Sequence, residues 1–303
     1  MTDHAPPGIA HGPVRLDQRP GVEVVDSHLH LWDRRRHEYP WLDRLAHLGV
    51  RVNAALLAET VTGLAGAVFV EAAAAPADSA NELRWLAAEA DRCAFPVRIV
   101  VGHVPGDPAW WLGRPGADLV TGVRRRMHLA QPGEIAAPEF RAFALAAGES
   151  GLVVDLVVRA EQLDEVDVLC RKTPGTRFVL DHLGNLAPGS EGFDAWATGI
   201  GWVAENPNVS CKLSPIAVRP GDPPFLPQVA ARYLAHALNS FGADRCLYGT
   251  DWPVLTHTIA FGAWLDLVRY VLGEATAADR HAVLAGNARQ LYGLPVPVTA
   301  GAA

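Results

Sequence analysis

Residues 24–32 read Val-Val-Asp-Ser-His-Leu-His-Leu-Trp, and this stretch decides how the rest of the chain is interpreted. Asp26, His28 and His30 fall on every second position after an apolar start, which is the pattern of a β-strand. Side chains two positions apart on a strand point to the same face, so both imidazoles leave the strand in one direction. Two histidines held in this way supply half of a site for zinc or a similar first-row metal, provided that other ligands converge on them.

The composition limits the kind of protein. The chain has 303 residues and is 50% hydrophobic, which is enough for one large domain. We expect neither a membrane-spanning segment nor a leader peptide. A net charge of -7 without a Lys/Arg stripe argues against nucleic acid or a membrane surface as partner, so we expect a small-molecule substrate. The sequence is compatible with a homo-oligomer.

The cysteines favour a reduced, cytoplasmic protein. Cys93, Cys170, Cys211 and Cys246 lie far apart and form no C-x-x-C pair.

Eight short apolar segments are predicted to be strands, and most are separated by segments of helical periodicity. The predicted strands are 22–25, 66–70, 97–101, 119–123, 152–158, 177–180, 209–213 and 245–248. The predicted helices are 79–90, 138–150, 161–172, 194–205, 227–241, 258–272 and 277–291. This alternation predicts an α/β protein with a closed (β/α)8 TIM barrel. A doubly wound open sheet is the alternative, but no G-x-G-x-x-G follows the first strand.

The chain is expected to form a single domain. Residues 1–20 are rich in Pro, Gly, His and Ala without periodicity and are predicted to be a flexible arm. Residues 21–294 are predicted to form the barrel, and residues 295–303 a C-terminal tail. The segment 33–60 is predicted to be a long loop, which is often functional when it follows a strand.

Ionisable residues occur at the ends of five predicted strands. They are His28, His30, Glu71, Arg124, His182 and Asp251. In a (β/α)8 barrel the C-terminal ends of all strands open on one face, and that face carries the active site. We therefore expect these side chains to converge. A carboxyl oxygen of Asp251 more than about a dozen ångströms from the imidazoles of His28, His30 and His182 would contradict this, because metal ligands lie far closer.

Three motifs carry a family resemblance. They are His28-x-His30, the segment 180–184 (Leu-Asp-His-Leu-Gly) and the segment 248–254 (Tyr-Gly-Thr-Asp-Trp-Pro-Val), supported by 122–124, 211–214 and 287–289. Over about residues 22–293 the chain resembles the amidohydrolase superfamily. More narrowly, it resembles the amidohydrolase-related (amidohydrolase 2) branch, which includes fuconolactonase-, rhamnonolactonase- and pyrone-dicarboxylate-lactonase-like enzymes.

The resemblance implies a metal-dependent hydrolase, with a lactone as the expected substrate. Opening a lactone needs a base, a group that polarises the carbonyl and support for the oxyanion. Asp251 is the expected base, with a helix N-cap as its alternative role. His28 and His30 are expected to hold a divalent metal, with Asp251 and His182 as further ligands. His182 is alternatively a hydrogen-bond donor to the oxyanion, or a loop histidine without catalytic role.

Other residues are assigned to the substrate. Arg124 suits a carboxylate or a hydroxyl-rich ring, but an ion pair with Glu71 is its alternative role. Glu71 is a ligand, a support of the ligands or part of the rim. Lys212 is either a substrate-binding group or a buried charge paired with an acid. Trp32 and Trp252 are expected to wall the pocket, with core packing as the alternative.

The chain also departs from the superfamily pattern. The segment 152–158 has no histidine, and the predicted fourth strand ends in Arg124 where relatives often have a modified lysine. We therefore expect one metal at most. Zinc is the predicted cofactor, manganese is the alternative, and catalysis without a metal stays open.

Two other functions remain as alternatives. One is an amidohydrolase-related decarboxylase or lyase acting on a small unsaturated or aromatic acid, including a Schiff-base version on Lys212. The other is a barrel that binds without catalysis. The joint presence of His28, His30, His182 and Asp251 argues against mere binding.

Overall fold

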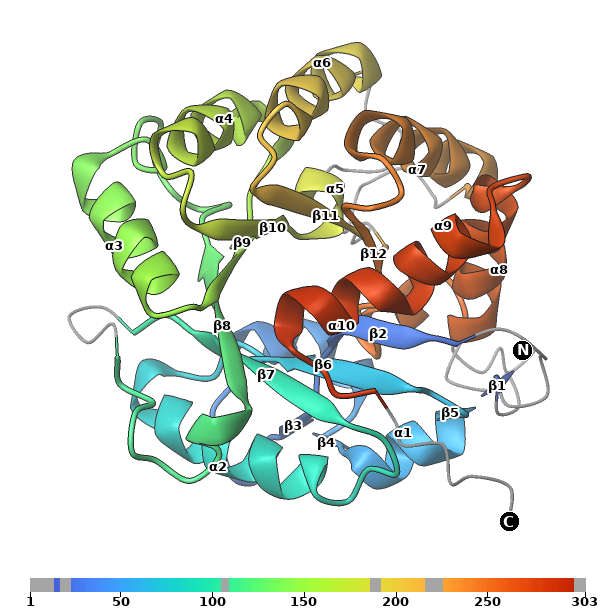
Figure 1. Ribbon diagram of the computed structural model, residues 1–303. Helices are drawn as coiled ribbons and strands as arrows, with labels where there is room; N and C mark the ends of the chain where they lie inside the picture. The colour runs from blue at the N-terminus through green and yellow to red at the C-terminus, as the bar shows by residue number, and fades with distance from the viewer. Residues whose placement is uncertain (1–13, 17–22, 105–108, 186–191, 216–225, 297–303) are drawn as a thin grey trace, which may run out of the picture.

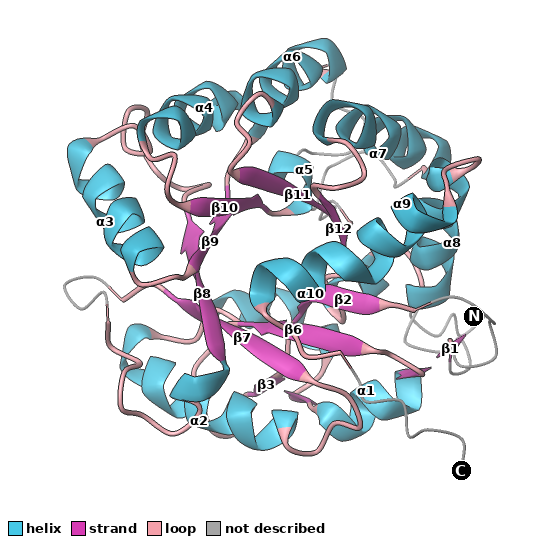
Figure 2. Ribbon diagram, viewed as in Figure 1, coloured by secondary structure: helices cyan, strands magenta, loops and turns pink. Residues whose placement is uncertain are grey.

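A computed structural model describes residues 14–16, 23–104, 109–185, 192–215 and 226–296. Eight parallel strands form a barrel that is surrounded by helices (Figures 1 and 2). In order around the barrel they are β2 (Val25–Leu29), β6 (Gly66–Val70), β7 (Val97–Gly102), β8 (Val120–Arg126), β9 (Val153–Val157), β10 (Arg177–Leu180), β11 (Val209–Leu213) and β12 (Cys246–Tyr248). The predicted (β/α)8 barrel is confirmed, and each of the eight predicted strands has its counterpart.

The outer helices form because each has one apolar face to bury against the strands. They are α2 (Ser79–Ala90), α3 (Pro138–Glu149), α4 (Leu163–Lys172), α6 (Phe193–Ala204), α7 (Pro227–Phe241) and α8 (Phe261–Leu272). In α4, Leu163, Val166 and Leu169 are buried, while acidic residues occupy the first turn and basic residues the last. That charge order complements the helix dipole. Among the described residues, no helix is long and apolar enough to cross a membrane.

The predicted loop 33–60 contains regular structure that the sequence analysis missed. It holds part of β3 (Trp32–Asp33), η1 (Pro40–Leu48), β4 (Arg51–Val52) and α1 (Ala54–Thr60). The strands β3 and β4 pair antiparallel, and Asn53 caps α1 by accepting a hydrogen bond from the Leu56 amide. These elements are too short for periodicity to reveal them.

Part of the predicted N-terminal arm is held against the barrel domain. Within residues 14–16, β1 (Val14–Arg15) pairs in parallel with β5 (Val61–Thr62). The other residues of the arm and residues 297–303 of the predicted tail lie outside the described part of the chain.

The barrel closes where β2 meets the segment after β12. The His30 amide donates to the Trp252 carbonyl at 2.8 Å, and the Asp251 amide donates to the His28 carbonyl at 2.8 Å. The Asp26 carboxylate accepts from the Thr250 hydroxyl at 2.6 Å and from its amide at 3.0 Å. The histidine motif of β2 is therefore fixed next to Asp251.

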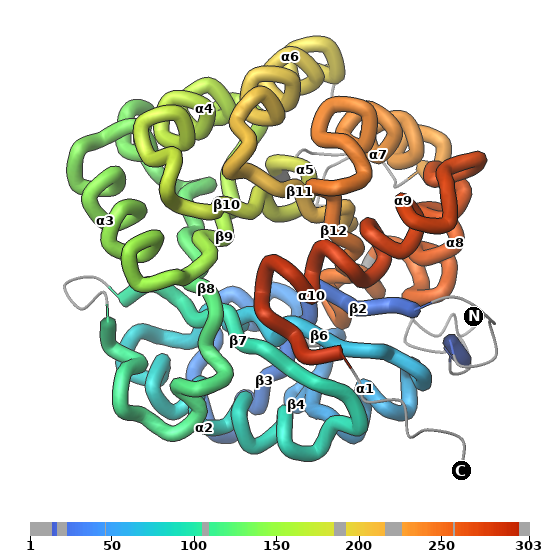
Figure 3. Tube along the Cα trace, in the orientation of Figure 1, coloured from blue at the N-terminus to red at the C-terminus, as the bar shows by residue number. Residues whose placement is uncertain are grey.

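The opposite end of the barrel is covered by the C-terminal helices. The predicted helix 277–291 is divided into α9 (Ala277–His281), a π-helical turn η6 (Ala282–Gly286) and α10 (Asn287–Tyr292). Figure 3 shows this segment crossing the barrel opening. Ala285, Ala288 and Tyr292 pack against Val25, Val68 and other strand residues that point inwards. The floor of the barrel is thus a packed core.

Candidate active site

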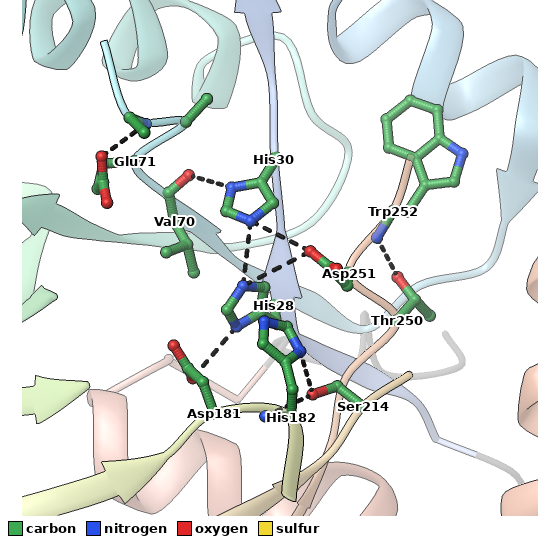
Figure 4. A network of polar contacts seen from close by, with 12 residues as sticks. His28, His30, Val70, Glu71, Asp181, His182, Ser214, Thr250, Asp251 and Trp252 are labelled. Atoms are coloured by element: carbon green, nitrogen blue, oxygen red, sulfur yellow. Dashed lines mark hydrogen bonds and ion pairs between the residues drawn. The ribbon is translucent and has the colours of Figure 1, made fainter. Parts of the chain in front are cut away.

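Three predicted metal ligands meet at the C-terminal end of the barrel (Figure 4). The Nε2 atoms of His28 and His30 lie 3.1 Å apart. Asp251 Oδ1 lies 3.2 Å from Nε2 of His30 and 3.8 Å from Nε2 of His28. All three side chains are buried. The separations are far below the dozen ångströms that would have contradicted the expected convergence.

The far nitrogens of the two imidazoles have different neighbours. His30 Nδ1 lies 2.9 Å from the Val70 carbonyl, which can only accept, so Nδ1 carries the proton and Nε2 presents its lone pair. His28 Nδ1 lies 3.1 Å from the Lys212 ammonium, which can only donate, and 3.3 Å from Asp181 Oδ1. Burial, together with the nearby Lys212 ammonium, holds the pKa of His28 well below its usual value. Both rings are therefore oriented with Nε2 towards Asp251.

His182 lies beside this cluster, with its ring centroid 4.5 Å from that of His28. Its Nδ1 is 2.9 Å from the Ser214 hydroxyl, which also accepts a hydrogen bond from the His182 amide at 3.2 Å. The Ser214 hydroxyl accepts from that amide and can donate its own proton to Nδ1, and in this arrangement the ring proton of His182 is on Nε2. Burial lowers the pKa of His182 and favours the neutral ring.

Two of the site residues have left-handed backbones. The φ angle is 51° at His182 and 56° at Asp251. Such conformations cost on the order of 1–3 kcal/mol for residues other than glycine and persist where the surroundings fix them. Here the hydrogen bonds of His182 with Ser214 and of the Asp251 amide with β2 provide that support.

The donor set fits one divalent cation. Tetrahedral zinc with bonds of about 2.0–2.1 Å places its ligand atoms roughly 3.3 Å apart, close to the separations among His28, His30 and Asp251. A second group of donors, His28, Asp181 and His182, also converges within 4.8 Å. Asp181 Oδ2 is buried and has no hydrogen-bond donor among the described residues. An acceptor of this kind is the usual partner of a cation or of a water molecule.

Beneath the histidines lies a buried charge network. The Lys212 ammonium contacts Asp155 Oδ2 at 2.5 Å, Asp181 Oδ1 at 3.0 Å and His28 Nδ1 at 3.1 Å. The Tyr292 hydroxyl on α10 donates to Asp155 from below, 2.9 and 3.0 Å from its two oxygens. Burial alone would lower the pKa of Lys212, but the two carboxylates raise it. Lys212 is thus the buried, paired charge that the sequence offered as an alternative, and its side chain is fully shielded from solvent.

The two acids around Lys212 have shifted pKa values. Burial would raise the pKa of Asp181, but Lys212 and His28 hold it well below its usual value. Burial raises the pKa of Asp155 to about 6. Lys212 and Asp181 are therefore both charged at neutral pH.

Arg124 and Glu71 form the ion pair that the sequence offered as an alternative role. Arg124 Nε donates to Glu71 Oε1 at 2.7 Å, and its Nη2 donates to the Glu71 carbonyl at 2.7 Å. Burial would raise the pKa of Glu71, but Arg124 and Arg126 lower it. Gly102 lies between these residues, and a Cβ there would come within 3.3 Å of the Glu71 carboxyl group. Because Gly102 has no side chain, the Glu71 carboxylate can reach across β7 to Arg124.

The two tryptophans predicted at the pocket wall lie in the core. Trp32 is 0% and Trp252 is 1% exposed. The Trp32 ring packs edge-on against Trp41, and the Trp252 indole points away from the histidine cluster in Figure 4.

Sequence reasoning gave no role to Asp155, Asp181, Ser214 or Tyr292. Asp155 is a single charge in an otherwise apolar strand, which was a usable signal. Asp181 and Ser214 fall within motifs that were quoted for the family resemblance. Nothing in the local sequence around Tyr292 indicates that it reaches the barrel interior.

The chain is similar to known proteins over most of its length. The amidohydrolase family model matches residues 25–294. An L-fucono-1,5-lactonase of Burkholderia ambifaria is 29% identical over 290 residues, which cover 90% of this chain and 96% of the relative.

Among solved structures, an amidohydrolase from Burkholderia multivorans with bound zinc has a TM-score of 0.74 at 24% identity, covering 90% of this chain and all of that one. A Pseudomonas putida protein described as a 2-pyrone-4,6-dicarboxylic acid hydrolase has a TM-score of 0.63 at 22% identity, covering 89% of this chain and 97% of that one. At these identities the two structures show a shared fold.

Proposed function

Because the chain belongs to the amidohydrolase family, we propose that it is a hydrolase that opens a lactone with a water molecule activated by Asp251. The observation that carries the proposal is the convergence of His28, His30 and Asp251 within 3.8 Å at the barrel mouth. The relative from Burkholderia ambifaria acts, by its name, on a sugar lactone. A sugar lactone or a related cyclic ester is the proposed substrate.

Asp251 supplies the proton transfers. Its carboxylate takes a proton from the attacking water and returns it to the ring oxygen when the lactone opens. The hydrogen bond from the Asp251 amide to the His28 carbonyl at 2.8 Å fixes the residue against β2, and its carboxylate oxygen lies 3.2 Å from His30 Nε2. Fixing a base in this way replaces a bimolecular encounter by a preorganised one.

His28, His30 and Asp251 are the proposed holders of a single divalent cation, zinc or alternatively manganese. When bound, such a cation polarises the lactone carbonyl and acidifies water.

His182 is proposed to donate from Nε2 to the oxyanion that forms at the carbonyl, because the Ser214 hydroxyl can donate a hydrogen bond to Nδ1 and leave the ring proton on Nε2. Its role as a further metal ligand is the alternative. A preorganised donor of this kind is worth a hundred- to a thousandfold in rate, by order of magnitude.

Replacing the base tests the proposal most directly. We expect Asp251→Asn to lose on the order of a thousandfold in kcat on a lactone panel read by acid release, because the amide cannot accept the proton. Asp91→Asn, an exposed carboxylate at the end of α2, is the matched control and should keep the full rate. A rate that survives Asp251→Asn nearly intact would exclude Asp251 as the base.

Metal removal tests the cofactor. Chelated protein should lose activity and regain it with one equivalent of zinc, and elemental analysis should find at most one metal per chain. A chelated enzyme that keeps its full rate would show that the reaction needs no metal.

The decarboxylase alternative predicts a different product. Release of carbon dioxide from a small unsaturated or aromatic acid, with no acid release from any lactone, would replace the lactonase proposal by that alternative.

We also propose a reduced, cytoplasmic location. Cys93, Cys170, Cys211 and Cys246 are all free thiols, and three of them are buried. A chain without disulfides suits a reducing compartment.

A further inference from the structure

A cavity of about 400 Å³ opens at the C-terminal end of β8. Its lining includes Arg124, Arg125, Arg126, His103, His128 and Glu134. Arg124 lies close enough to Asp181, Asp251 and His182 to interact with them electrostatically. Its partner Glu71 directly follows Val70, whose carbonyl orients His30.

The cavity is electropositive on a chain whose net charge is -7. Of the described residues that line it, Glu134 alone carries a carboxylate, against three guanidinium groups. Glu71 compensates one further positive charge through its contacts with Arg124 at 2.7 Å and Arg126 at 3.5 Å. Three arginines against two carboxylates leave a net positive charge, which suits a carboxylate.

Two residues of the cavity lining carry buried polar atoms without a hydrogen-bond partner among the described residues. Arg125 is fixed by cation–π contacts, with its guanidinium carbon 4.9 Å from the Phe140 ring centroid and 5.2 Å from that of Phe143. The His103 ring packs against Phe143 at 4.8 Å. Arg125 Nε and His103 Nδ1 are both buried and have no hydrogen-bond partner in the described part of the chain. A buried polar atom without a partner costs free energy, so such atoms commonly mark a binding site.

We propose that this cavity binds a carboxylate carried by the substrate, so that the enzyme acts on acidic lactones in preference to neutral ones. The inference rests on the proposed function and names the substrate class for it. Arginine suits this role because its planar fork pairs with a carboxylate through charge-assisted hydrogen bonds. The cavity would hold the charged substituent while the lactone carbonyl lies at the histidine cluster.

A matched pair of substrates tests the proposal. A hexonolactone and the corresponding aldarolactone differ only in a terminal hydroxymethyl group, which is a carboxylate in the second compound. We expect kcat/KM to be ten- to a hundredfold higher for the carboxylated lactone, which is the range for one charge-assisted contact. Equal or lower kcat/KM for the carboxylated lactone would overturn the proposal.

The variant Arg126→Gln tests whether the preference for the carboxylated lactone comes from this cavity. Arg126 is half-exposed, so it can be replaced with little risk to the fold. The ratio of the two kcat/KM values should fall at least tenfold in this variant, and Arg125→Gln should lower it as well. Arg84→Gln on the exposed face of α2 is the matched control and should leave the ratio unchanged. An unchanged ratio in both cavity variants would assign the preference elsewhere and refute the site.

A binding measurement separates this proposal from the proposed reaction. Calorimetric titration with glutarate needs no turnover, and Arg126→Gln should weaken this binding about tenfold or more. If neither lactone is hydrolysed but glutarate binding depends on Arg126, the anion site stands and the lactonase proposal fails. If lactones are hydrolysed, and glutarate binds the original protein and Arg126→Gln equally or binds neither of them, the lactonase proposal stands and the anion site fails.

Discussion

Lys212 shows at the level of one residue how the site is held from below. Its three ammonium protons face three acceptors from three strands, Asp155 on β9, Asp181 after β10 and His28 on β2. A buried ammonium is tolerated only when it is paired and hydrogen-bonded in this way. The same contacts fix Asp181 and the Nδ1 edge of His28, so the charge that stabilises the barrel interior also orients a candidate ligand.

Removing this charge should destabilise the whole barrel. We expect Lys212→Met to lower the free energy of unfolding by about 3–5 kcal/mol, because Asp155 and Asp181 are left as buried carboxylates without a counter-ion. Urea unfolding followed by circular dichroism measures the change. Lys172→Met, on the exposed end of α4, is the control. A Lys212→Met protein within about 1 kcal/mol of the original would mean that the pair contributes far less than a typical buried one.

A milder change probes the same network from the floor. Tyr292→Phe keeps the ring but removes the hydroxyl that donates to Asp155. We expect a loss of about 1 kcal/mol, the usual net value of one hydrogen bond. The same unfolding experiment measures this loss. A decrease in the free energy of unfolding as large as that of Lys212→Met would show that the Tyr292 hydroxyl contributes more than its hydrogen bond.

At the level of elements, the seam between β2 and the segment after β12 determines the site. Thr250 is its central residue. Its hydroxyl donates to Asp26 Oδ2 at 2.6 Å and accepts from the Trp252 amide at 3.0 Å. Asp251 lies between these two anchored residues, so its position depends on them.

Breaking the seam should therefore affect both stability and rate. Thr250→Val keeps the side-chain shape but removes one hydrogen-bond partner from the Asp26 carboxylate and one from the Trp252 amide. Each loss should lower the free energy of unfolding by about 1–3 kcal/mol. We expect kcat to fall on the order of ten- to a hundredfold as Asp251 shifts. Thr198→Val removes an exposed hydroxyl from α6 and serves as the control for urea unfolding and lactone turnover. A stable variant with an unchanged rate would show that Asp251 is positioned without Thr250.

Strand and helix positions followed from local sequence because each barrel element repeats one pattern over enough residues. The predicted strands 66–70, 177–180 and 209–213 match the observed bounds. The two-residue strands β1, β3, β4 and β5 could not be predicted, because each is defined by a partner strand rather than by its own sequence. The break of the last helix at η6 likewise depends on packing across the barrel floor.

The candidate site could also be predicted only in part from the sequence. The strand-end rule for a barrel was sufficient to bring His28, His30 and Asp251 together. It could not decide between the alternative roles of Arg124 and Lys212, because their partners are 53 and 57 residues away in sequence. Which acid pairs with which base is a property of the folded barrel, and periodicity carries no information about it.

For the whole molecule, buried acids make stability depend on pH. Glu82 on α2 is 4% exposed, and its Oε1 accepts a hydrogen bond from the Ala72 amide at 3.0 Å. Burial, with the neighbouring carboxylate of Glu71, raises the pKa of Glu82 from 4.5 to about 8. Between these two values the folded protein keeps a proton that the unfolded chain releases. The free energy of unfolding must then fall as the pH rises through this window, by up to about 1.4 kcal/mol per pH unit from this group.

Glu82→Gln should remove this contribution while keeping the acceptor for the Ala72 amide. We expect the variant to gain stability relative to the original protein as the pH rises from 5 to 8, because glutamine has no proton to lose. Urea unfolding at several pH values measures the two slopes, and the difference between them isolates Glu82 from every other titrating group. Glu149→Gln, an exposed residue at the end of α3, should leave the slope unchanged. Parallel slopes for Glu82→Gln and the original protein would show that Glu82 is ionised in the folded state, and its burial would then have to be offset by a cation near α2.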